Sequence, residues 1–247
     1  IRMAVRETIS KGADFIKFGT TGASGAAGAN PTLTTITMEE IAAITDQAHR
    51  QNVRCACHAH GTPGIKAAVI GGTDSIEHGT YMDDECIELM KKHGTFFVPT
   101  LSVTHRIHTS KNLLDRLGVP TEISDRAGYA WEHHVCSVQK AWRAGVEIAC
   151  GSDGIWMPAL WAGESALELE LLVRYVGMSP MDAIVAATKV SAKAIGKEKD
   201  LGTIEPGKLA DIIIVDGDPL KDIKILQDLS NVKMVLKGGE IEVDRGP

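Results

Sequence analysis

The sequence lacks the features of several protein classes. No apolar run in its 247 residues approaches the ~18 residues of a membrane-spanning helix. The net charge of -6 argues against the basic surface that nucleic acid or anionic lipid requires. Its five cysteines are too sparse for a disulfide scaffold, and no C-x-x-C pair indicates a zinc knuckle or redox motif. We therefore expect a soluble globular protein with reduced thiols and no nucleic-acid partner.

The first residues also lack the pattern of a targeting signal. The chain starts at Ile1 and enters a helix-like run directly, with nothing that resembles a signal peptide. We expect a cytoplasmic location. Secretion stays open, because the true N-terminus would precede Ile1.

The sequence does contain a regular alternation of short apolar strands and longer helices. Strands are expected at 13–18, 53–61, 73–78, 95–100 and 146–153. Helices are expected at 3–12, 38–51, 62–70, 83–93 and 122–144, with a longer insertion at 101–120. This alternation predicts an α/β fold with a parallel sheet and right-handed crossovers. The chemistry of such folds lies at the carboxyl ends of the strands.

Four of the expected strands end in residues of the kinds found in metal sites. These residues are Lys17, His58 with His60, His78 and Asp153. A single strand-end histidine more often has a structural role. Four matches at one edge of a sheet nevertheless indicate a metal site. Because side chains alternate along a strand, His58 and His60 should share a face, whereas Cys55 and Cys57 should lie on the opposite face as packing residues.

Lys17 fits this set only after a chemical change, because an ammonium group cannot bind a metal ion. Burial beside apolar neighbours such as Phe15 would lower the pKa of Lys17. The neutral amine could then capture carbon dioxide as a carbamate, whose two oxygens can bridge two metals. The alternative is an unmodified lysine paired with Asp14 or with the acidic end of a barrel.

Several long segments of the chain resemble the amidohydrolase superfamily. The closest likeness is to its imidazolonepropionase-like branch, which includes Xaa-Pro dipeptidases and related metal-dependent carboxypeptidases. The similar segments span most of residues 4–239 and include GADFIKFGTTG, CHAHGTPGIKAAVIGGTDSIEHGTYMDDECIELM, AGVEIACGSDG and LGTIEPGKLADIIIVDGDPL. The resemblance implies a (β/α)₈ TIM barrel with a small β-sandwich. Residues 1–199 would form a partial barrel, strands 4–8, and residues 200–247 would form strands of the sandwich.

The same resemblance implies a role for each strand-end residue. Lys17 would be the carboxylated lysine of strand 4. His58 and His78 would be the metal ligands of strands 5 and 6. Asp153, on strand 8, would bind metal and act as the catalytic proton carrier. The intact site would hold two divalent ions, expected to be zinc, whose positive charge activates a water molecule for attack on an amide carbonyl.

Other residues near the strand ends are candidate substrate contacts. His60 could contact substrate, support a ligand or exchange roles with His58. Tyr81 follows the strand that carries His78. His105 and Arg106 follow VPTL and could bind a substrate carboxylate, the alternative being a solvated basic loop. The adjacent histidines of the 122–144 helix, at positions 133 and 134, are expected at the surface or in helix packing.

This chain departs from the family pattern in two places. Family members carry an H-x-H pair on strand 1, but the H-x-H here, His58 to His60, has the surroundings of strand 5. The chain therefore resembles the C-terminal part of a protein of roughly 400 residues, without strands 1–3. The segment 156–165 also departs from its relatives, so the substrate preference does not transfer.

The expected function is metal-dependent hydrolysis of amide bonds in dipeptides or N-acyl amino acids. Such an enzyme would act on a small-molecule or dipeptide substrate, and we expect the intact protein to be a homo-oligomer. One alternative is a mononuclear deaminase or cyclic amidohydrolase with an unmodified Lys17. Another is a non-catalytic barrel protein. Because Lys17, His58, His78 and Asp153 are all present, truncation explains the missing pair better than decay of the site.

Overall fold

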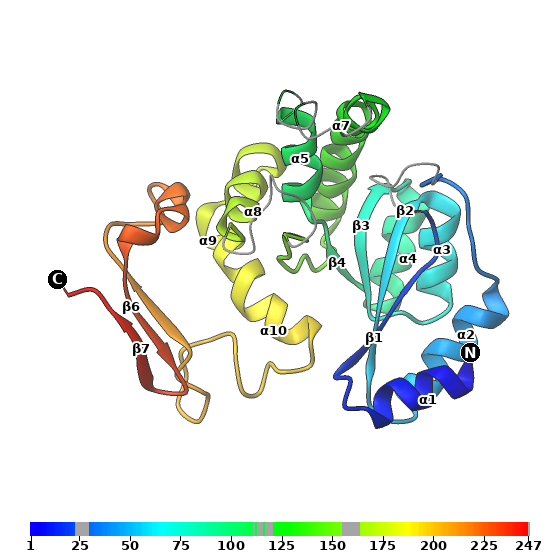
Figure 1. Ribbon diagram of the computed structural model, residues 1–247, viewed down its shortest axis with the longest axis horizontal. Coiled ribbons are helices and arrows are strands. Elements are labelled where there is room, and N and C mark those ends of the chain that lie inside the picture. Colours follow the sequence, from blue (N-terminus) through cyan, green and yellow to red (C-terminus); the bar gives the residue numbers. More distant parts are fainter. Residues whose placement is uncertain (23–29, 111, 113–115, 117–120, 155–163, 247) are drawn as a thin grey trace.

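The computed structural model describes residues 1–22, 30–110, 112, 116, 121–154 and 164–246 (Figure 1). Its first part contains α1 (Arg2–Ser10), β1 (Phe15–Gly19), α2 (Met38–His49), β2 (Arg54–Gly61), α3 (Thr62–Ile70), β3 (Ser75–Tyr81), α4 (Asp84–His93) and β4 (Phe96–Val98). Helices α5 (Leu101–Thr109) and α7 (Thr121–Ala144) follow. The expected alternation of helices and strands is thereby confirmed. The start of the expected insertion at 101–120 is helical, and much of its remainder lies outside the described residues.

Four parallel strands form one sheet in the order β1-β2-β3-β4. In this register His58 lies opposite Gly19 on one side and Glu77 on the other. The fifth strand expected at 146–153 is wrong in extent, because Ile148 forms only an isolated parallel bridge with Phe97. Just beyond it, the backbone N–H of Cys150 donates to Ser191 Oγ at 3.1 Å instead of extending a ladder.

Local sequence sets the ends of the helices that flank the sheet. Thr37 and Glu40 form a capping box at the start of α2, since each side chain accepts a hydrogen bond from the backbone N–H of the other. Asp83 caps α4, and Gly94 closes that helix in the left-handed conformation, with φ of 68°. Helices α2 and α3 then pack against β2 on the outer face of the sheet (Figure 1).

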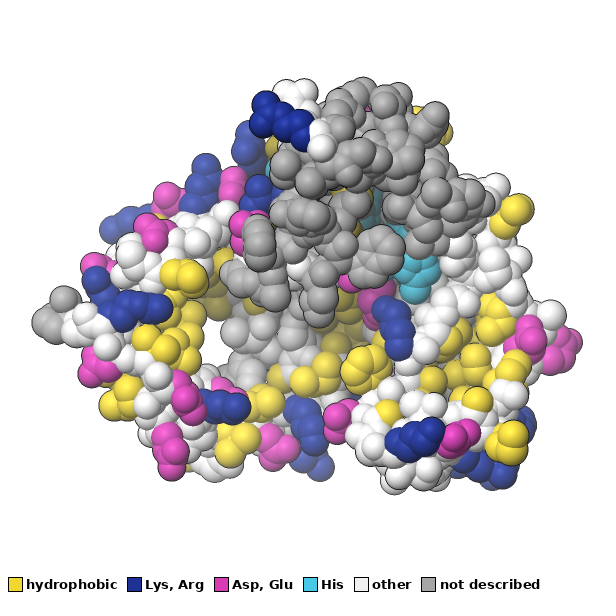
Figure 2. Space-filling view, viewed as in Figure 1, with side chains coloured by type: hydrophobic (Ala, Val, Ile, Leu, Met, Phe, Trp, Pro, Cys, Tyr) yellow, Lys and Arg dark blue, Asp and Glu magenta, His cyan; other side chains and the backbone are white. Residues whose placement is uncertain are grey.

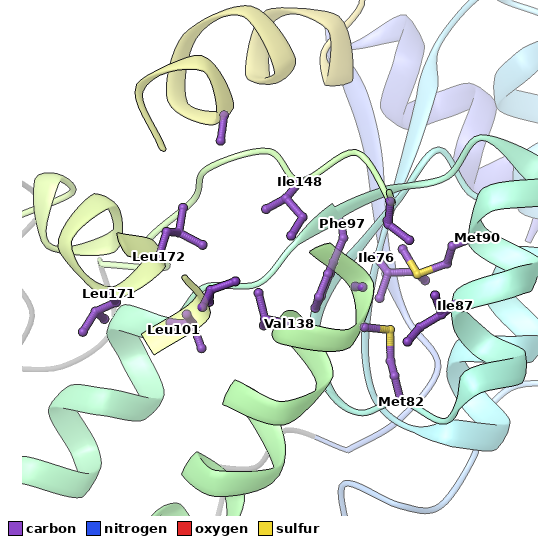
Figure 3. Packing of buried hydrophobic residues seen from close by; sticks show 14 of the residues in the cluster. Ile76, Met82, Ile87, Met90, Phe97, Leu101, Val138, Ile148, Leu171 and Leu172 are labelled. Atoms are coloured by element: carbon purple, nitrogen blue, oxygen red, sulfur yellow. The ribbon is translucent and has the colours of Figure 1, made fainter. Parts of the chain in front are cut away.

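The main core lies between the sheet and the helices around it. Ile76, Phe97 and Met90 are fully buried there, and Leu101 and Leu171 continue the cluster toward the C-terminal helices (Figure 3). Close packing leaves little free space. A Cβ on Gly79, where φ is +56°, would lie 2.5 Å from Cε2 of Phe97. The backbone next to His78 is thus held firmly against the core.

The rest of the chain forms a helical segment and a separate small sheet. The helical segment contains α8 (Ala166–Leu171), η1 (Leu172–Val176), α9 (Pro180–Val185), η2 (Ala186–Val190) and α10 (Ser191–Ala194). Strands β5 (Ile212–Val215), β6 (Val232–Lys237) and β7 (Glu240–Asp244) form an antiparallel sheet, with the short helices η3 (Ile223–Gln227) and η4 (Leu229–Asn231) between the first two strands (Figure 1). Within the described ranges, no helix is both long and apolar enough to cross a membrane.

Candidate metal centre

Three histidines from two neighbouring strands converge at the carboxyl end of the parallel sheet. A ligand nitrogen of each of His58, His60 and His78 lies within 4.8 Å of the others. The rings of His60 and His78 are stacked with centroids 4.7 Å apart, and His58 meets each of them edge to face. The expectation that His58 and His60 share a face is therefore confirmed. Figure 2 shows histidine side chains on the wall of a hollow, beside basic and acidic groups.

Threonine hydroxyls at the ends of two strands orient two of these rings. His60 Nδ1 lies 2.8 Å from Thr80 Oγ1, and His78 Nδ1 lies 2.7 Å from Thr100 Oγ1. A hydrogen bond at Nδ1 fixes the rotation of an imidazole and selects Nε2 as the nitrogen for a metal. The two threonines are site residues that our sequence analysis missed, because their role depends on contacts between strands.

The environment of the three histidines favours their neutral form. Burial is the main cause that lowers the pKa of His58, and burial lowers the pKa of His60 and His78 well below the ordinary value of 6.5. Neutral imidazole is the form that binds metals. His58 Nε2 is also buried with no hydrogen-bond partner among the described residues. A desolvated nitrogen of this kind is a good candidate metal ligand.

The backbone at the strand ends is strained. His78, Thr100 and Asp153 all have positive φ, at 72°, 56° and 51°. Residues other than glycine rarely adopt this conformation, and where it is retained it often marks a functional site. With this backbone conformation, the side chain of His78 in β3 and that of Thr100, the residue before α5, face each other and form a hydrogen bond.

Lys17 lies near this centre in a different environment from the one expected. Its side chain is 44% exposed, and its neighbour Phe15 is 55% exposed, so the expected burial of Lys17 is wrong. Lys17 Nζ donates to Glu77 Oε2 at 2.5 Å rather than to Asp14. The two ion-paired groups line a cavity of about 1080 Å³ on the inner face of the sheet. Glu77 is a further residue that our sequence analysis missed.

The charge on Lys17 reaches the other residues expected in the site. It contributes to the lowered pKa of His58 and of His78, and it opposes the rise in the pKa of Asp153. Burial is the main cause that raises the pKa of Asp153 above its ordinary value. The other three residues chosen from the sequence, His58, His78 and Asp153, thus lie within electrostatic range of Lys17.

A fourth histidine lies behind the cluster. His134, in α7, is completely buried, and its Nδ1 lies 3.1 Å from Thr104 Oγ1. Burial lowers its pKa to about 4, although the backbone carbonyls of His78 and Pro99 lie close enough to oppose that shift. The expected role in helix packing agrees with this burial. Nothing in the sequence distinguishes His134 from its exposed neighbour His133.

The candidate substrate-binding residues fall into two groups. Tyr81 is the last residue of β3, and the centroid of its ring lies 5.4 Å from that of the His133 ring. His105 and Arg106 lie in α5, so the alternative of a basic loop is wrong. His105 packs against Trp131 with ring centroids 5.0 Å apart, and Arg106 pairs with Glu164 at 2.6 Å. The segment 155–163, most of the divergent loop, lies outside the described residues.

Comparison with known proteins places the chain in a family. The model of the amidohydrolase family matches residues 1–241. The chain belongs to the amidohydrolase family. It is 36% identical to ochratoxinase of Aspergillus niger over 242 residues, which are 98% of this chain and 48% of that protein. The chain thus spans about half the length of this curated relative.

Solved structures of other proteins share the fold described above. The crystal structure of A. niger ochratoxinase has a TM-score of 0.88 at 35% identity, covering 99% of this chain and 54% of that one. An Xaa-Pro dipeptidase with bound methionine in its active site also has a TM-score of 0.88 at 35% identity, covering 98% and 57%. The resemblance found in the sequence is therefore confirmed at the level of the family.

Proposed function

We propose that this chain carries the metal-binding side of an amidohydrolase site that hydrolyses amide bonds in dipeptides or N-acyl amino acids. The main support is the convergence of His58, His60 and His78 at the carboxyl end of a parallel sheet. A solved relative is an Xaa-Pro dipeptidase, by name an enzyme of dipeptides. In this proposal residues 1–199 form the part of a TIM barrel that contains strands 4–8, and residues 200–247 belong to a β-sandwich.

The side chains at this centre suit a divalent metal, zinc above all. His58 and His78 would supply neutral imidazole and Asp153 a carboxylate, and a carboxylated Lys17 would bridge a second ion. The buried and unpartnered His58 Nε2 fits this role. When bound, divalent ions polarise an amide carbonyl and lower the pKa of a water molecule. With Nε2 facing the metal, Nδ1–H of His60 and of His78 would donate to Thr80 Oγ1 and Thr100 Oγ1, which keeps these two rings in place.

The protein's own groups would then transfer the proton and hold the substrate. Asp153 would accept a proton from the attacking water and return it to the leaving amine, and burial raises its pKa, which favours acceptance of the proton. Arg106 is half-buried, and its Nε has no hydrogen-bond partner among the described residues. A guanidinium in that state is suited to a substrate carboxylate, with His60, Tyr81 and His105 as further contacts.

Replacing Asp153 tests this assignment. We expect Asp153→Asn to lower hydrolysis of Xaa-Pro dipeptides and N-acyl amino acids by about 10²–10⁴, because general acid–base catalysis contributes that much. The assay uses the full-length protein loaded with zinc, because this chain spans about half the length of its curated relative, and it follows amine release. Asp14→Asn is the matched control, because Asp14 is an exposed carboxylate beside β1. Equal activity of the Asp153 variant and the wild type would refute the role of Asp153.

One observation favours a second candidate function. Lys17 Nζ contacts Glu77 Oε2, and this contact would hold an unmodified lysine in place, as the alternative of a mononuclear deaminase or cyclic amidohydrolase requires. Metal analysis and mass spectrometry under native conditions separate the two functions. Two metals and the added mass of one carbon dioxide on Lys17 support the amide hydrolase. One metal and an unmodified Lys17 support the deaminase or cyclic amidohydrolase.

A further inference from the structure

A second group of metal-binding side chains lies at the opposite end of the sheet. His49 is the last residue of α2, Cys55 is the second residue of β2, and Asp74 directly precedes β3. One ligand atom from each residue lies within 4.8 Å of the others. Cys55 and His58 are three residues apart on β2, which is about 10 Å along a strand. This group is therefore distinct from the histidine centre.

Asp74 holds the group together. Its Oδ2 accepts a hydrogen bond from the backbone N–H of Cys55 at 2.7 Å and lies 2.8 Å from His49 Nε2. The backbone N–H of Asp74 in turn donates to the carbonyl of Cys55 at 2.9 Å. These contacts connect the end of a helix to the starts of two neighbouring strands. The candidate metal-ligand atoms therefore lie close together before any ion binds.

The surroundings provide a path for an ion and a place for a further ligand. His49 and Asp74 line a surface hollow of about 430 Å³, and His93 and Glu147 line the same hollow. The side chain of His49 is 43% exposed, whereas Cys55 is buried against Ile44. The hollow, which Arg54 and Lys193 also line, gives an ion access to His49 and Asp74, and the Cys55 thiol lies within 4.8 Å of their ligand atoms.

We propose that His49, Cys55 and Asp74 form a second metal site, selective for zinc-like ions that accept a thiolate. Sulfur, imidazole and carboxylate ligands together match the preferences of zinc and cobalt, and not those of magnesium or calcium. Tetrahedral zinc places its ligand atoms about 3.5 Å apart. His49 Nε2 and Asp74 Oδ2, which are 2.8 Å apart, would therefore move apart slightly to admit the ion. Water or His93 would fill the fourth position. The ion would join α2 to the starts of β2 and β3.

Cobalt is a suitable probe because only a thiolate ligand gives its complex an intense sulfur-to-metal charge-transfer band in the near ultraviolet. The metal-free 247-residue chain is titrated with Co²⁺ under reducing conditions. We expect the band in the wild type and its complete loss in Cys55→Ser. Because Cys55 is buried, His49→Gln provides a second variant at an exposed position, and we expect at least a tenfold weaker cobalt affinity there.

Two control variants separate this site from other sources of the signal. Cys57→Ser removes the neighbouring buried thiol on the same face of β2, and His58→Ala removes a ligand of the histidine centre. Both should keep the charge-transfer band with unchanged affinity. Absence of the band in the wild type, its persistence in Cys55→Ser, or unchanged affinity in His49→Gln would overturn the proposal. If Cys55→Ser does not fold, the cobalt affinity of His49→Gln decides.

Discussion

Glu168→Gln should change both the stability of the fold and the way that stability depends on pH. Glu168, in α8, is fully buried, and its carboxylate accepts hydrogen bonds from the backbone N–H groups of Leu101 and Ser102 at 2.8 and 2.7 Å. Ser102 Oγ donates a third bond at 2.6 Å. These bonds satisfy the start of α5, where the preceding Thr100 provides no side-chain cap.

Glutamine has the same shape but only one acceptor oxygen. Its amide N–H₂ would face a donor on α5, leaving one buried backbone N–H unsatisfied. A buried unsatisfied group costs about 1–3 kcal/mol. We therefore expect the unfolding free energy of Glu168→Gln to be lower than that of the wild type by this amount in acid, where the carboxyl group of Glu168 is protonated and both side chains are neutral. The start of α5 also carries Thr100, which orients His78. The substitution therefore reaches the candidate metal centre through the helix.

The pH dependence follows from the ionisation of Glu168. Burial raises its pKa from 4.5 to about 7, while the hydrogen bonds from Ser102 and Leu101 oppose that shift. The folded protein holds this proton more tightly than the unfolded chain. The contribution of Glu168 to stability is thus fully present below pH 4.5 and is lost as the pH rises toward about 7. At 1.36 kcal/mol per pKa unit, the loss is roughly 3 kcal/mol.

Urea unfolding at about pH 4.5 and about pH 8 measures this effect. Because glutamine does not titrate, the advantage of the wild type over Glu168→Gln should shrink by roughly 3 kcal/mol between the two conditions. Other titrating groups cancel in the comparison. Glu242→Gln, at an exposed position on β7, is the control: its difference in stability from the wild type should be the same at both pH values. A difference between wild type and Glu168→Gln that stays constant with pH would refute this reasoning.

Two further substitutions test the centre and the core beside it. Thr100→Val removes the hydroxyl partner of His78 Nδ1 and should weaken zinc binding by about 10–100-fold in calorimetric titration; unchanged affinity would contradict the orienting role. Gly79→Ala should destabilise the protein by about 2–4 kcal/mol in urea unfolding, because its Cβ clashes with Phe97 at a positive φ. Gly94→Ala has a similar φ but open space around it, so it should cost about half as much, and equal costs would argue against the clash.

Much of the parallel sheet could be predicted because strand and helix signals were local. The helices expected at 38–51 and 83–93 agree within two residues with α2 and α4. The strand expected at 146–153 failed for a non-local reason. The segment pairs only around Ile148, and beyond it the backbone N–H of Cys150 bonds to Ser191 Oγ, a partner far away in sequence that periodicity does not reveal.

The histidines of the candidate site could also be predicted, because strand ends in a parallel sheet lie at one edge. Their partners could not, since Thr80, Thr100 and Glu77 act through contacts between strands. The burial of Lys17 was inferred from apolar neighbours in sequence. In the structure Phe15 is itself exposed and lines the same cavity as Lys17, and the lysine pairs with Glu77.

Zinc titration of the metal-free chain tests the central claim most directly. The titration is made by calorimetry in the His49→Gln background, so that the second proposed site does not contribute. We predict that His58→Ala and His78→Ala each weaken zinc binding by at least tenfold. The control His133→Ala, at an exposed position of α7, should leave the zinc affinity unchanged. Equal zinc affinity in all of these variants would contradict the assignment of the histidine cluster as the metal centre.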